Sequence, residues 1–139
     1  MSFYDLGIFG NPSAETHDRL SATISRMIRE FGLSVGADVI LHNRDTIHTR
    51  NTRSAFAAAY FGGETLVDSE IASTLAGASL PIIPVAQSDG NFAANIPEAI
   101  RGANGLRLRT DDTDLTELAV AMLECVGLLR RQRRVFISG

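Results

Sequence analysis

Hydrophobic residues in this chain form short, mostly apolar runs that alternate with helical stripes. The runs at residues 3–9, 37–41 and 80–85 have the length of strands, and the uninterrupted run at 80–85 is typical of a strand buried on both sides. Between the first two runs, apolar side chains recur at spacings of three and four, which is typical of an amphipathic helix. They are Leu20, Ile24, Met27, Ile28 and Phe31. We expect Asn11 and Pro12 to start this helix as N-cap and first helical residue, and Gly32 to end it.

The second half of the chain repeats this order of elements. Residues 65–78 predict a helix whose inner face carries Val67, Ile71, Thr74, Leu75 and Ala78, directly before the run at 80–85. Residues 97–102 predict a short helix that ends at Gly102, and residues 105–109 alternate as an edge strand does. A final stripe after Asp111 and Asp112 predicts a closing helix. It consists of Leu115, Leu118, Met122, Val126 and Leu129.

The middle of the chain is ambiguous. Residues 42–53 are polar and favour a loop. The alanine-rich segment 54–61 fits either a helix or a buried strand, which decides whether the sheet has four or five strands. The alternation of strands and helices predicts an α/β fold, a flavodoxin-like three-layer sandwich. Its four- or five-stranded parallel sheet would carry helices on both faces.

Composition limits the classes of function. The 139 residues suit one domain, which we place at 1–130, with a basic linker and the start of a following domain at 131–139. A net charge of −3 gives no reason to expect a nucleic-acid partner, and no apolar run is long enough to span a membrane. The single cysteine, Cys125, excludes an internal disulfide, and we expect it to pack beside the last stripe. A cytoplasmic location is the default expectation.

Glu70 is the strongest candidate for chemistry. It precedes Ile71 at the margin of the apolar helix face, and its helix leads into a buried strand whose end should border a ligand crevice. Breaking an N-glycosidic bond builds positive charge on the ribose, which a fixed carboxylate stabilises. The alternative is a solvated glutamate in a surface ion pair.

Other polar residues carry weaker signals. Asn11 and Ser13 could bind a phosphate at the start of the first helix, or simply cap that helix. A charged loop could close over a nucleotide, contact another subunit or be solvated; its charged residues are Arg44, Asp45, Arg50 and Arg53. His42 and His48 flank Asp45 and suggest a metal site, but with no further ligand at suitable spacing we predict none.

Two segments carry a family resemblance. DSEIASTLAGASLPIIPV and IPEAIRGANGLRLRTDDTDLTELAVAML resemble the C-terminal half of a bacterial TIR (Toll/interleukin-1 receptor) domain over residues 66–129. In that family a glutamate-bearing helix precedes a strand of the type IPVIPV, followed by a proline-led turn, a short strand and a closing helix. The resemblance implies that Glu70 is the residue that cleaves NAD at the nicotinamide–ribose bond. It also implies that Phe9, Gly10, Asn11 and Ser13 border the nucleotide, and we add Arg44 to this binding set.

The chain also departs from the TIR pattern. Enzymatically active members usually carry a Trp-Cys pair ahead of the glutamate, whereas this chain has no tryptophan and has Val67 at the cysteine position. Nucleoside 2-deoxyribosyltransferases offer a second resemblance, through Glu70, Ile71 and Ala72 ahead of an apolar strand. Their glutamate attacks the sugar as a nucleophile.

These observations lead to three functional expectations. The first is a signalling or defence module that binds NAD or a related nucleotide and, if active, is an NAD nucleosidase that requires no cofactor. The second is a non-enzymatic domain that associates with itself or with other TIR-like domains. The third is an enzyme like the deoxyribosyltransferases. None of them involves a nucleic acid or a membrane.

Overall fold

The computed structural model describes residues 3–63, 66–87, 96–100, 106–108 and 115–128. Within these ranges the chain forms five strands, three α-helices and two 3-10 turns. In chain order they are β1 (Tyr4–Gly10), α1 (Ala14–Arg29), β2 (Val39–His42), η1 (Ile47–Thr49), β3 (Ala55–Phe61), α2 (Ser69–Gly77), β4 (Ile82–Gln87), η2 (Glu98–Ile100), β5 (Leu106–Leu108) and α4 (Leu115–Cys125).

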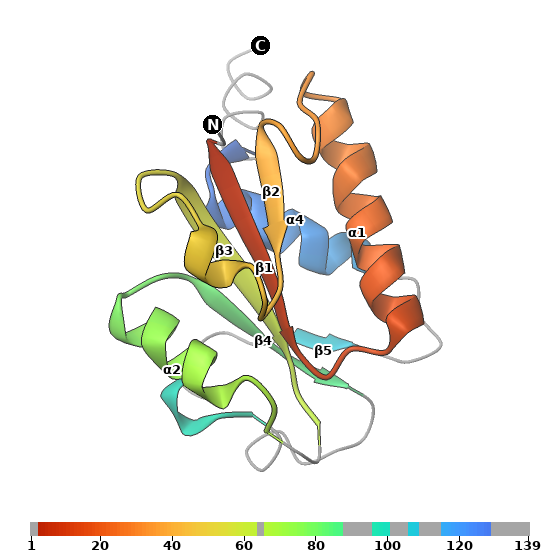
Figure 1. The fold of residues 1–139 in the computed structure, drawn as a ribbon. Coiled ribbons are helices and arrows are strands. Elements are labelled where there is room, and N and C mark those ends of the chain that lie inside the picture. Colours follow the sequence, from red (N-terminus) through yellow and green to blue (C-terminus); the bar gives the residue numbers. More distant parts are fainter. Residues whose placement is uncertain (1–2, 64–65, 88–95, 101–105, 109–114, 129–139) are drawn as a thin grey trace.

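The five strands form one parallel sheet in the order β2-β1-β3-β4-β5. The chain first steps from β1 to β2 and then returns to place β3 on the other side of β1, so the direction of the winding reverses between β1 and β3. Helices α1 and α4 cover one face of the sheet, and α2 covers the other (Figure 1). This arrangement confirms the predicted flavodoxin-like α/β fold, and β5 is the expected edge strand.

The ambiguous segment 54–61 forms the central strand. β3 pairs with β1 along its full length and with β4 on its other side. Three of its four alanines are fully buried between two layers: Ala57 and Ala59 face α1 and α4, and Ala58 faces α2. Alanine favours helix in isolation, but here its small side chain lets both helical layers approach the sheet, so tertiary packing overrides helix propensity.

Three of the five residues in the first predicted stripe are fully buried: Leu20, Ile24 and Ile28. Met27 and Phe31 are only half-buried, and Phe31 lies beyond the end of α1. Gly32 ends the helix as predicted. It has φ 77°, and the N–H of Leu33 donates to the carbonyl of Ile28.

The predicted start of α1 was wrong. Its N-cap is Ser13, whose Oγ accepts from the N–H of Thr16 at 3.1 Å, and Pro12 lies outside the helix. The N–H of Asn11 instead donates to the carbonyl of Phe61 at 2.9 Å and so extends the pairing of β1 with β3.

The helix predicted at 65–78 is shorter than expected. α2 begins at Ser69, so Val67 lies outside it, and only Ala72 and Leu75 are buried on its inner face. Thr74 and Ala78 are exposed.

The closing helix α4 has the predicted inner face over Leu115, Leu118 and Met122, and Val126, one residue past its end, is also buried. Cys125 is exposed rather than packed, because it lies on the outer side of that stripe. Leu129, Asp111, Asp112, Gly102 and the linker 131–139 lie outside the described residues. Within the described part, none of the helices has both the length and the apolar character needed to cross a membrane.

Candidate functional site

A groove lies between α2 and the loop 43–54, which connects β2 to β3 and contains η1. Its volume is about 400 Å³. The loop contributes Ile47, His48, Arg50 and Thr52, and α2 contributes Glu70, Ile71, Thr74, Leu75 and Ala78. At this place, where a doubly wound fold usually has a crossover helix, this chain has only the single turn η1.

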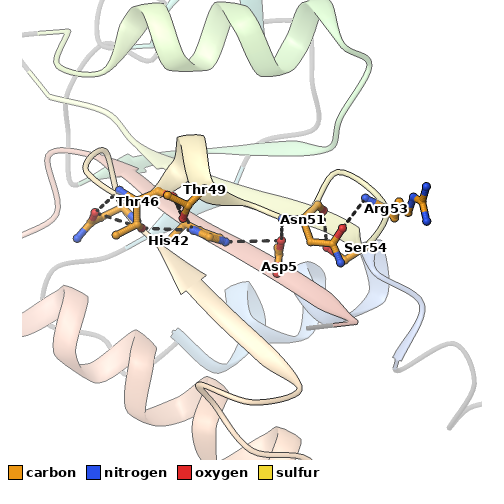
Figure 2. A network of polar contacts seen from close by, with 8 residues as sticks. Asp5, His42, Thr46, Thr49, Asn51, Arg53 and Ser54 are labelled. Carbon is orange, nitrogen blue, oxygen red and sulfur yellow. Dashed lines mark hydrogen bonds and ion pairs between the residues drawn. The ribbon is translucent and has the colours of Figure 1, made fainter. Parts of the chain in front are cut away.

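A buried polar network fixes the loop on the sheet (Figure 2). Asp5 in β1 has a side chain 1% exposed, and its Oδ2 accepts from the N–H of Asn51 at 2.9 Å. The same oxygen lies 3.6 Å from Nε2 of His42, whose side chain is 3% exposed. A buried carboxylate is costly unless it is hydrogen-bonded, so the bond from Asn51 holds the far end of the loop against β1, while Asp5 lies beside His42 at the near end.

The first half of the loop is shaped by local hydrogen bonds. Oδ1 of Asn43 accepts from the N–H groups of Asp45 and Thr46 at 2.8 and 3.2 Å. The carbonyl of Thr46 lies 3.2 Å from Nδ1 of His42 and accepts from Oγ1 of Thr49 at 2.6 Å. Asparagine and threonine side chains favour such turns, so the polar sequence of this segment folds into a defined structure.

Charged and nitrogen-bearing side chains from both walls line the groove. Glu70 is exposed in the first turn of α2, and His48 is exposed on η1. Cζ of Arg50 lies 5.2 Å from the centroid of the Phe56 ring, a cation–π contact that holds the guanidinium beside the groove. His42 contacts Asp5, whereas His48 lines the groove, so the two histidines lie in different environments. The described residues contain no group of three histidine, cysteine, aspartate or glutamate side chains that could hold a metal ion.

A second cluster lies at the carboxyl ends of β1 and β3. The N–H of Gly10 donates to Oδ2 of Asp68 at 2.9 Å, and Nε of Arg44 lies 3.2 Å from Oδ1 of the same carboxylate. The side chain of Asp68 is 6% exposed, whereas that of Arg44 is 53% exposed. Gly10 has φ 87°, and a Cβ there would lie 2.2 Å from the carbonyl oxygen of Phe61, so only glycine fits.

Tyr60 lies beside this cluster. Its hydroxyl donates to the carbonyl of Val67, the residue before Asp68. Burial, and to a lesser extent the negative charge of Asp68, raise the pKa of Tyr60 to about 12.

The predicted site residues do not all lie together in the structure. Glu70 lines the groove, while Gly10 and Arg44 meet at Asp68. Phe9 is buried in the core, and Ser13 caps α1. Asn11 packs against Gly63, where a Cβ would lie 2.8 Å from its Nδ2.

Sequence reasoning missed Asp68. Its role depends on a left-handed backbone and on a contact with a strand far away in the chain, and neither leaves a local pattern.

Comparisons with family models, with curated proteins and with solved structures found no match to this chain. The resemblances to TIR domains and to deoxyribosyltransferases therefore stay predictions from the sequence.

Proposed function

We propose that this chain binds a nucleotide in the groove between loop 43–54 and α2, with Glu70 facing the ribose. The observation that carries the proposal is that Glu70 shares one groove with His48 and Arg50. Small-molecule sites combine apolar walls with a few convergent polar groups, and this groove has that composition. Ile47, Ile71 and Leu75 offer apolar surface for a flat ring.

NAD is the proposed substrate because of the chemistry that Glu70 can support. When the nicotinamide–ribose bond breaks, its electron pair leaves with nicotinamide and positive charge develops on the ribose. A carboxylate beside the ribose stabilises that charge, and water adds to the sugar carbon and releases a proton. Arg50 supplies positive charge for the diphosphate. The TIR-like sequence around Glu70 supports the same assignment.

The test is nicotinamide release by the purified chain at high protein concentration, since a module of this kind could act only when assembled. We expect Glu70→Gln to reduce release by about 100-fold or more, because it removes the stabilising charge and little else. Glu117→Gln is the matched control: Glu117 is also an exposed glutamate in the first turn of a helix, on the opposite face of the sheet. This variant should release nicotinamide at the unmodified rate.

Other outcomes point to other functions. Equal release from the Glu70 and Glu117 variants would reject Glu70 as the catalytic group. Folded protein that neither binds nor cleaves NAD would reject the proposal, and self-association in sedimentation would then favour the interaction domain. Exchange of deoxyribose between bases without NAD turnover would favour the transferase.

A further inference from the structure

The carboxylate of Asp68 occupies a place where two anion-binding groups converge. One oxygen accepts from the N–H of Gly10, and the other faces the guanidinium of Arg44. A backbone N–H and an arginine at the end of a strand are a donor pair that suits phosphate as well as carboxylate. The position is also the carboxyl end of β1 beside β3, where the winding reverses and where open parallel sheets bind their ligands.

Asp68 adopts an unfavourable backbone conformation to reach this place. Its φ of 61° and ψ of 21° lie in the left-handed region, which costs energy for residues other than glycine, although less for aspartate and asparagine than for most. Asp68 directly precedes α2, and an aspartate there usually takes an extended backbone and caps the helix. In this structure its side chain makes no capping hydrogen bond to α2. Asp68 therefore contacts Gly10 and Arg44 instead of adopting a relaxed backbone and capping α2.

We propose that Gly10 and Arg44 form a phosphate subsite, and that Asp68 is an intramolecular competitor for it. The phosphate group of a nucleotide takes over the Gly10 N–H and the Arg44 guanidinium. Asp68 then returns to an extended backbone and caps α2. Arg44 is half exposed, so the phosphate reaches it directly from solvent. The inference that this phosphate belongs to a nucleotide rests on the proposed function. The replacement of the Asp68 carboxylate by a phosphate does not.

The replacement of Asp68 by phosphate would couple phosphate binding to the position of Glu70 in the groove. Asp68 and Glu70 are separated by one residue, so a change in the backbone of Asp68 moves the first turn of α2, which carries Glu70. Phosphate binding at the end of β1 would thereby set the position of the carboxylate that faces the ribose.

The experiment titrates inorganic pyrophosphate into the full chain and follows the Gly10 amide by NMR. Asp68→Asn removes the competing charge, and asparagine tolerates the left-handed backbone. We expect this variant to bind pyrophosphate about tenfold more tightly than the unmodified chain, with a shift of the Gly10 amide, because the charged competitor is gone. Adding Arg44→Gln should abolish the gain. If Asp68→Asn does not fold, Asp68→Gly tests the same release, since glycine adopts this conformation freely.

The matched control is Asp45→Asn, which removes the same charge from the residue next to Arg44. Asp45 is exposed, and the Gly10 N–H bonds to Asp68 rather than to it. Equal pyrophosphate affinity in the Asp68 and Asp45 variants, or a Gly10 amide that does not move, would overturn the subsite. Because Glu70 is not involved in this titration, tight pyrophosphate binding without nicotinamide release would support the subsite and reject only the cleavage reaction.

Discussion

The two faces of the sheet are built differently. The face under α1 and α4 is packed with apolar side chains, and one cluster runs from Leu20 and Ile24 in α1 to Leu118 and Met122 in α4. The opposite face carries the nine-residue helix α2 and a loop in place of a second long helix. That face also holds the buried pair of Asp5 and His42 and borders the groove.

Strand β1 shows how one element serves both faces. Leu6 and Ile8 point into the apolar cluster, whereas Phe9 points into the smaller cluster under α2. By the same alternation Asp5 points to the α2 side, where its carboxylate holds the loop. A buried carboxylate weakens a core unless it is well paired. Its placement on the α2 face, the thinner layer, indicates that this face is organised to position residues. The face under α1 and α4, the thicker layer, supplies most of the stability.

Truncation of a buried leucine on each face tests this comparison with the largest expected effect. Leu118→Ala should lower the free energy of unfolding by about 4 kcal/mol, because Leu118 is fully enclosed and its loss leaves a cavity. Leu75→Ala should cost about 2 kcal/mol, since Leu75 borders the groove and its space opens to solvent. Urea denaturation measures both. Equal losses would show that the two faces contribute alike.

Removal of the buried carboxylate tests the α2 face alone. Asp5→Ala should cost about 2–3 kcal/mol, because the N–H of Asn51 loses its acceptor and His42 loses the carboxylate beside it. Hydrogen exchange of the Asn51 amide should accelerate more than exchange in α1. Asp5→Asn is the matched control, since its amide oxygen can still accept from Asn51. A loss below about 0.5 kcal/mol for Asp5→Ala would mean that the network does not hold the loop.

The thicker face could be predicted from the sequence, because its elements follow local periodicity. The spacing of Leu20, Ile24 and Ile28, and that of Leu118 and Met122, sets which side of each helix is buried, whatever the rest of the chain does. The continuous run at 80–85 likewise predicted β4, a strand buried between two layers.

The α2 face could be predicted only in part, because its contacts join distant residues. Nothing near Asp5 in the sequence shows that it will bind Asn51, and nothing near Asp68 shows that it will bind Gly10. The alanines of β3 gave no decisive signal because their partners are β1 and β4. Glu70 could be chosen as a candidate because its helix and the strand after it are local features, but the groove beside it depends on the shape of loop 43–54.

Tyr60 gives a smaller effect that can be followed with pH. Tyr60→Phe should cost about 1 kcal/mol near neutral pH, because the carbonyl of Val67 loses its donor. Tyr60 has a pKa of about 12 in the folded chain against 10.0 for the ordinary phenol, so folding disfavours its ionised form. Its contribution to stability is therefore complete below pH 10 and is lost as the pH rises from 10 to about 12.

Absorbance of the phenolate during an alkaline titration measures this difference. The chain has two tyrosines, and Tyr4 provides the control. Tyr4→Phe should leave the high-pH transition in place, and Tyr60→Phe should remove it. Asp68→Asn should lower the pKa of Tyr60, because the charge of Asp68 contributes to raising it. A Tyr60 that ionises near pH 10 in the folded chain would contradict its burial beside Asp68.

The smallest expected change in stability is at Glu70. Its carboxylate is exposed in the first turn of α2, where a negative charge gains only a weak interaction with the helix dipole. Glu70→Gln should therefore change the free energy of unfolding by about 0.5 kcal/mol or less in urea denaturation. Glu117→Gln, in the same position of α4, should change it by a similar amount. A larger loss for Glu70 alone would mean that its charge supports the packing of α2. A loss of nicotinamide release in that variant would then no longer separate chemistry from folding, whereas a small and equal loss in both variants allows the comparison to assign Glu70 to the reaction.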